Sequence, residues 1–159
     1  AELRDEGRKM LVFSQFTELL AIVRAAFDAA GLSHAYLDGS TPAERRIAEV
    51  DRFQEGKVDA FLLSLKAGGV GLNLTAASEV IHLDPWWNPA VEDQATDRAH
   101  RIGQKRTVYS IKLLTRGTVE EKVLELQRRK KSIIDATLTS DEQVMGKLTW
   151  DDIQNLLKM

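Results

Sequence analysis

Short apolar runs alternate with amphipathic stretches along most of this chain, and that alternation restricts its fold more than any other feature. Runs typical of buried strands cover residues 10–13, 34–37, 58–63, 79–83 and 107–114. Strands that alternate with helices pair in parallel, and the helices then cover both faces of the sheet. The sequence therefore predicts an α/β fold with a doubly wound, mostly parallel sheet. In such sheets, ligands bind beyond the carboxyl ends of the strands.

Capping residues mark the expected starts of the helices. An amphipathic stretch at residues 16–30 ends at Gly31. Two further helices should begin where a cap residue precedes a first-turn proline, at Thr41 and at Asn88. The second of these is expected to carry the arginines that follow it.

The pattern changes at Thr118, where a capping box opens a helix with an acidic start and a basic end at residues 128–131. This helix is expected to form a C-terminal extension of the fold. We therefore divide the chain into a lobe, a helix that follows the lobe, and a linker with a short terminal helix. These parts are placed at residues 1–117, 118–136 and 137–159.

The composition favours a globular domain and excludes several classes of protein. The 159 residues are 43% hydrophobic and 29% charged, and no apolar run approaches the roughly 18 residues that cross a membrane. Cysteine is absent, and the histidines lack partners at ligand spacing, so no metal site is predicted. The polar N-terminus does not resemble a signal peptide, which favours an intracellular protein. Because the net charge is −2, a contact with DNA would use a local patch, or the strongly basic surfaces would lie on other parts of a parent protein.

Polar residues follow the predicted strand ends and should therefore gather on one rim of the sheet. They include Gln15, Ser40, Lys66 and Trp87. Ordinary structural roles are open for several neighbours, because Ser14 and Thr41 are suitable helix caps. The glycines of residues 68–71 lack the Gly-Lys-Ser/Thr ending of a phosphate-binding loop, and by themselves they favour a tight turn.

Two arginines form the most informative pattern in the chain. On a helix, Gln94, Arg98 and Arg101 would fall within one narrow face. Two forked, permanently charged guanidinium groups and an amide suit the binding of a polyphosphate during its transfer. The alternative is a solvated helix end, where cations complement the helix dipole.

Three motifs occur in the order and close to the spacing of the last motifs of helicase-like ATPases. They read KAGGVGLNLT at residues 66–75, DPWWNP at 84–89 and QATDRAHRIGQ at 94–104. Together they resemble the Swi/Snf family of ATP-driven translocases on double-stranded DNA. The resemblance runs from about residue 9 to residue 104 and more loosely to residue 131. It covers the second of two RecA-like motor lobes.

The resemblance implies a role for each candidate residue. Arg98 and Arg101 look like arginine fingers that stabilise the γ-phosphate of ATP, and Gln94 would orient them or a water. Asn73 and Gly71 are expected near the nucleotide. The residues expected to contact DNA are Gln15, Ser40, Lys66, Gly68, Gly69 and Trp87. Trp86 is expected to close the core. The basic end at residues 128–131 of the helix that follows the lobe is interpreted as part of a brace toward the first lobe, in preference to a DNA contact.

The sequence thus predicts the second motor lobe of a DNA translocase that uses ATP, with Mg²⁺ held by a first lobe. Its expected partners are double-stranded DNA and that first lobe, and the resemblance leaves open whether the parent works on nucleosomes, RNA polymerase or repair complexes. A prokaryotic location in the cytoplasm or nucleoid is favoured over a nucleus. The alternatives are a non-catalytic DNA- or protein-docking module, or a stand-alone α/β enzyme with another cofactor.

Overall fold

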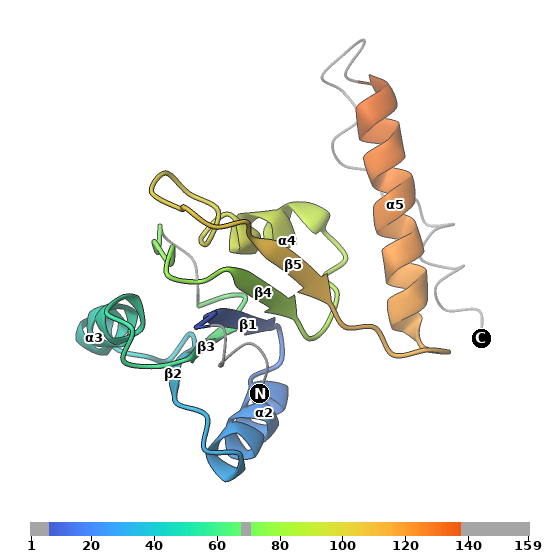
Figure 1. Ribbon diagram of the computed structural model, residues 1–159. Helices are drawn as coiled ribbons and strands as arrows, with labels where there is room; N and C mark the ends of the chain where they lie inside the picture. Colours follow the sequence, from blue (N-terminus) through green and yellow to red (C-terminus); the bar gives the residue numbers. More distant parts are fainter. Residues whose placement is uncertain (1–6, 68–70, 138–159) are drawn as a thin grey trace.

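Five parallel strands form the centre of the protein. The computed structural model describes residues 7–67 and 71–137 (Figure 1). The sheet has the order β2-β3-β1-β4-β5. Its strands are β1 (Met10–Ser14), β2 (His34–Leu37), β3 (Ala60–Ser64), β4 (Glu79–His82) and β5 (Tyr109–Lys112). The connections after β1 and β3 leave in opposite directions across the sheet, which is where parallel sheets open a crevice for ligands.

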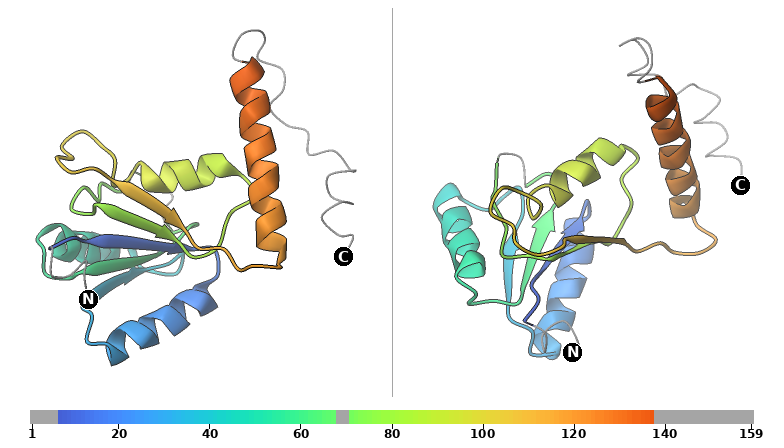
Figure 2. Two further views of the ribbon diagram at one scale, coloured as in Figure 1. Left: turned by 45° about the vertical axis from the view of Figure 1, so that its right-hand side comes forward. Right: turned by 45° about the horizontal axis from the view of Figure 1, so that its top comes forward.

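Helices cover both faces of this sheet (Figures 1 and 2). The covering helices are α2 (Thr17–Ala29), α3 (Ala43–Gln54) and α4 (Pro89–Thr96), and a further helix, α5 (Val119–Thr137), follows β5. Leu20 of α2 packs with Val12 and Leu62 on one face, whereas Phe53 of α3 and Ala95 of α4 belong to the core on the other. The predicted α/β fold is therefore confirmed. α5 stands beyond the β5 edge and is reached through residues 113–118.

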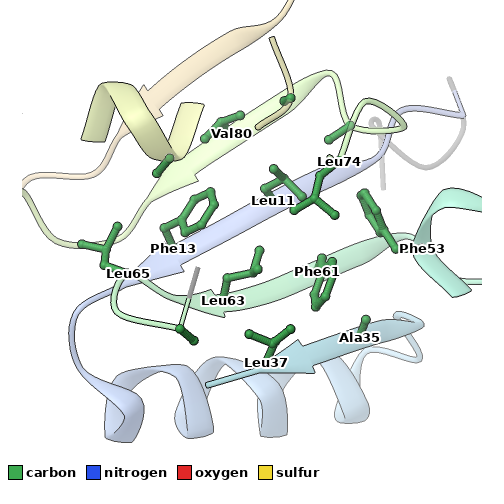
Figure 3. Packing of buried hydrophobic residues seen from close by; sticks show 14 of the residues in the cluster. Leu11, Phe13, Ala35, Leu37, Phe53, Phe61, Leu63, Leu65, Leu74 and Val80 are labelled. Carbon is green, nitrogen blue, oxygen red and sulfur yellow. The ribbon is translucent and has the colours of Figure 1, made fainter. Parts of the chain in front are cut away.

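The larger core lies on the face that α3 and α4 cover (Figure 3). Leu11, Phe13, Phe61 and Leu63 are each fully buried there, and Val80 of β4 continues the layer. Alternate residues of β1 and β3 point to the opposite face, so both strands are buried on both sides. This double burial explains why the central strands read as continuous apolar runs.

Several predicted boundaries need correction. α4 ends at Thr96, so the expected helical face that carries both arginines does not exist. Thr41 does not cap α3, because Pro42 is the N-cap residue and the Thr41 hydroxyl bonds Asp38 instead. The cap at Asn88 is confirmed, since its Oδ1 accepts from the Ala90 amide at 3.3 Å.

The C-terminal predictions are only partly visible. α5 begins after Thr118, whose Oγ1 accepts a hydrogen bond from the Glu120 amide. The expected linker and short terminal helix fall at residues 138–159, outside the described part of the chain. Within the described ranges, none of the helices combines the length and the apolarity needed to cross a bilayer.

The fold makes Phe61 a stringent test of the core. We expect Phe61→Ala to lower the free energy of unfolding by about 3–5 kcal/mol, because it removes a ring that packs at 5.4 Å from the ring of Phe53. Urea denaturation measures this change. Ile22→Ala is the matched control, since Ile22 is 67% exposed on α2 and should cost little. Equal losses in the two variants would contradict the described core.

Candidate functional site

The rim formed by the carboxyl ends of the strands carries four of the residues predicted to contact DNA. Gln15 follows β1, Ser40 follows β2, and Lys66 follows β3. Trp87 lies in the loop after β4 and is 52% exposed. Because all five strands run in parallel, these positions share one edge of the sheet. Gly68 and Gly69, also expected to contact DNA, lie outside the described residues.

A small hollow brings the predicted catalytic residues together. Its volume is about 160 Å³. It is lined by Gly71, Leu72, Gln94, Asp97, Arg98 and Arg101. Gln94 belongs to α4, whereas both arginines lie in the turn that follows this helix. The residues therefore converge as predicted, although a turn and not a helical face assembles them. Asn73 is exposed beside the hollow without lining it.

Arg98 is a buried cation with an unmet hydrogen-bond donor. The residue is only 7% exposed, and its Nη1 has no hydrogen-bond partner among residues 7–67 and 71–137. Its guanidinium carbon lies 5.5 Å from the centroid of the Phe13 ring, which provides a cation–π contact. Burial, followed by the charge of Arg101, lowers the pKa of Arg98 to about 10. The side chain is thus charged at neutral pH and forms no ion pair within the described part of the chain, as expected for a group that receives an anion from a ligand.

The Phe13 ring also contacts His82 from β4. The two rings are stacked with centroids 5.7 Å apart. His82 is 1% exposed, and burial lowers its pKa below the ordinary value. The imidazole is therefore neutral at pH 7, so it does not add a second cation to the ring that supports Arg98.

Arg101 connects the arginine turn to the segment that begins at Gly71. Its Nη1 donates to the Gly71 carbonyl oxygen at 3.1 Å, while the residue itself is exposed. Gly71 has a φ of 65°, a left-handed conformation that favours glycine. The Leu74 amide donates to the Arg98 carbonyl at 2.9 Å. These bonds hold the two arginines against the glycine segment.

Gln104 fixes the far end of the same turn. Its Nε2 donates to the carbonyl oxygens of Thr75, Ala77 and Ala99 at 3.1, 2.7 and 3.0 Å. Its Oε1 accepts from the Arg106 amide at 2.9 Å. One amide group thereby joins the entry to β4 with the arginine turn. The motif ends in glutamine because a single side chain has to both donate and accept here.

Arg46 of α3 supports the neighbouring turn after β2. Its guanidinium donates to the carbonyl oxygens of Asp38, Gly39, Thr41 and Ala67. Arg46 therefore ties the β2 loop to the β3 loop. These contacts assign Arg46 a structural role.

Ser40 lies in a turn organised by Asp38. The Asp38 carboxylate accepts from the Ser40 amide at 2.8 Å and from its hydroxyl at 2.7 Å. The hydrogen bond from the Ser40 side chain is the main cause that lowers the pKa of Asp38. The carboxylate thus stays ionised at neutral pH, and the Ser40 hydroxyl is already engaged as a donor.

The loop after β4 separates its two tryptophans. Trp86 is partly buried and packs against the main core, as expected, whereas Trp87 is exposed. Their ring centroids lie 6.4 Å apart. The loop is anchored at Asp84, whose Oδ2 accepts from the Gln15 amide at 3.0 Å. Gln15 and Trp87 are therefore held by loops that contact each other.

Comparison with known proteins agrees with this architecture. The helicase conserved C-terminal domain matches residues 1–103. The ATP-dependent helicase rhp16 of Schizosaccharomyces pombe is 44% identical over 154 residues, which cover 96% of this chain and 18% of that protein. The chain spans between 11% and 18% of the length of the relatives it matches.

Two solved structures share the fold. The crystal structure of the C-terminal part of the Fun30 ATPase domain has a TM-score of 0.76 at 35% identity, over 94% of this chain and 43% of that one. The Sulfolobus solfataricus SWI2/SNF2 ATPase core in complex with double-stranded DNA has a TM-score of 0.72 at 34% identity. That match covers 99% of this chain and 33% of the other.

The parallel sheet, the rim and the arginine hollow define a RecA-like lobe of a helicase-type ATPase. The chain belongs to the helicase conserved C-terminal domain family, and within it to the second ATPase lobes of the Swi2/Snf2 type. The predicted resemblance is therefore confirmed.

The environments of Arg98, which is buried, and of Arg46, which is half-buried, predict opposite effects of the same substitution. We expect Arg98→Met to raise the free energy of unfolding by about 1 kcal/mol, because it replaces an unpaired buried charge by an apolar side chain of similar length. Arg46→Met should instead lower it by about 2 kcal/mol, since four backbone acceptors lose a charged donor. Urea denaturation without ligand compares the two. A loss for Arg98→Met as large as that for Arg46→Met would contradict the ligand-binding interpretation of Arg98.

Proposed function

We propose that this chain is the second motor lobe of an ATP-driven translocase on double-stranded DNA, and that Arg98 and Arg101 complete an ATP site shared with a first lobe. The observation that carries the proposal is the buried guanidinium of Arg98, which lines the hollow and whose Nη1 has no partner among the described residues. A phosphate oxygen is the acceptor that such a group lacks. The ATP-dependent relatives support the same assignment.

The size of the hollow supports a shared site. Its 160 Å³ falls below the roughly 300–1,000 Å³ of sites that enclose a small molecule. A terminal phosphate fits this space, whereas a whole nucleotide requires a second surface. In the proposal, ATP with Mg²⁺ is held by the first lobe and supplies the reacting phosphate. Closure of the lobes then brings that phosphate to the arginines.

Four polar residues in or beside the hollow have distinct tasks in this proposal. Arg98 offers a charge whose desolvation is already complete, so it stabilises negative charge on the phosphate strongly. Arg101 exchanges the neutral Gly71 carbonyl for a charged phosphate oxygen, which is a stronger acceptor. Gln94 orients the arginines or a water from the last turn of α4, and Asn73 lies toward the ribose.

The DNA contacts belong to the same rim. Lys66 and Trp87 are exposed there. Ser40 lies in the loop next to that of Lys66, and Gln15 lies in the loop between those of Lys66 and Trp87. In the proposal they contact the duplex backbone together with Gly68 and Gly69. The related Sulfolobus ATPase core, which was solved with double-stranded DNA, supports this role. Contacts to phosphates carry little sequence information, so the motor would move along DNA of any sequence.

The arginine fingers are tested in a two-lobe protein that carries this chain. We expect Arg101→Ala to reduce DNA-stimulated ATP hydrolysis by roughly 10³-fold, the usual contribution of an arginine finger. The melting temperature should stay unchanged, because the side chain is exposed and donates to one backbone carbonyl. Arg52→Ala is the control that should retain activity, because Arg52 lies in the last turn of α3 and does not line the hollow. Activity retained in Arg101→Ala would instead favour the non-catalytic docking module.

The division of the site predicts that the 159-residue chain alone hydrolyses ATP negligibly. The arginines have no phosphate to act on when the surface that binds the nucleotide is missing. Phosphate release should match the background with and without duplex DNA. Turnover that persists through purification and disappears in Arg98→Met would contradict the shared site and favour a stand-alone enzyme.

A further inference from the structure

Three buried or half-buried side chains that the proposed function does not use meet at the backbone of Trp86. They are Glu92 of α4, Lys112 of β5 and Gln127 of α5. These three elements follow one another along the chain, and α5 stands beyond the β5 edge of the sheet (Figures 1 and 2). We call this group the Trp86 clamp.

Glu92 holds one side of the loop. The residue is 1% exposed, and its Oε1 accepts from the Trp86 amide at 2.6 Å. Its Oε2 forms an ion pair with the Nζ of Lys112. A buried carboxylate is tolerated only when it is paired and hydrogen-bonded, and both conditions are met here. Glu92 therefore holds the backbone of Trp86 in place.

Gln127 holds the other side from α5. The residue is 5% exposed, and its Nε2 donates to the Trp86 carbonyl oxygen. Its Oε1 accepts from Lys112 at 3.3 Å. Both polar backbone groups of Trp86 are thus bonded to buried side chains, and Lys112 joins those two side chains to each other. Through this contact, the packing of α5 against the lobe becomes a component of the Trp86 clamp.

The consequence reaches Trp87, the next residue. The residue is 52% exposed and its ring is tilted by 38° against the ring of Trp86, so burial fixes the ring only in part. The direction in which it leaves the loop is set by the backbone that the Trp86 clamp holds.

We propose that Gln127 is a positioning residue for the rim, through which α5 fixes the Trp86 backbone and so aims Trp87 at its ligand. The inference rests on the proposed contact between Trp87 and duplex DNA. It makes the docking of α5 a requirement for tight coupling to DNA. A role in stability alone would leave that coupling unchanged.

Hydrogen exchange on the 159-residue chain tests the Trp86 clamp without reference to DNA. We expect Gln127→Met to accelerate exchange of the amides of residues 86–88 by about tenfold, because the isosteric side chain cannot donate to Trp86. The control is Glu125→Gln, which removes an exposed pair with Arg129 on the same helix. Unchanged exchange in Gln127→Met would overturn the proposal. Gln127→Glu, which keeps the acceptor for Lys112, repeats the test if the first variant folds poorly.

The two-lobe protein then tests whether Gln127 acts through Trp87. The measured quantity is KDNA, the duplex concentration that gives half-maximal stimulation of ATP hydrolysis. We expect Gln127→Met to raise KDNA by about fivefold, and to add nothing in a Trp87→Ala background. A normal KDNA for Gln127→Met, or an effect that adds fully to that of Trp87→Ala, would overturn the positioning role alone. A normal KDNA for Trp87→Ala would overturn the DNA role of Trp87, and this inference with it.

Discussion

Strand β1 pairs with β3 on one side and with β4 on the other, and this double pairing supports both the fold and the site. It buries Phe13 in the sheet and presents its ring to the guanidinium of Arg98. It also brings the loops after three neighbouring strands to one edge, where Gln15 bonds Asp84 of the β4 loop. The rim thus follows from the pairing of one central strand.

Two buried charged groups, one on α4 and one in the turn after it, have opposite electrostatic environments. Glu92 has a cation and a backbone donor, so its burial costs little and fixes a loop. Arg98 has an aromatic ring and no anion, so its burial remains uncompensated within the described part of the chain. The first arrangement is that of a structural group. The second is that of a group whose charge can be compensated by a bound anion, and the proposed ATP site is therefore built around Arg98.

The site was partly predictable from sequence, and the limits have physical causes. Spacing grouped Gln94 with Arg98 and Arg101, and they do line one hollow. The helix that was expected to join them ends at Thr96, because the bonds of Gln104 and of the Arg98 carbonyl hold the following residues in a turn. Three partners of these bonds, Leu74, Thr75 and Ala77, lie more than twenty residues before Arg98 and Gln104 in the chain. A local pattern carries no information about such contacts.

The sequence by itself determined the order of strands and helices, the family and the set of candidate residues, because apolar periodicity and motif spacing are local properties of the chain. Only the tertiary structure decided which polar groups are satisfied. It assigned Arg46 and Gln104 to backbone carbonyls, left Arg98 without an anion, and joined α5 to Trp86 through Gln127. Hydrogen bonds and desolvation depend on segments that meet in space, and their partners are therefore fixed by packing.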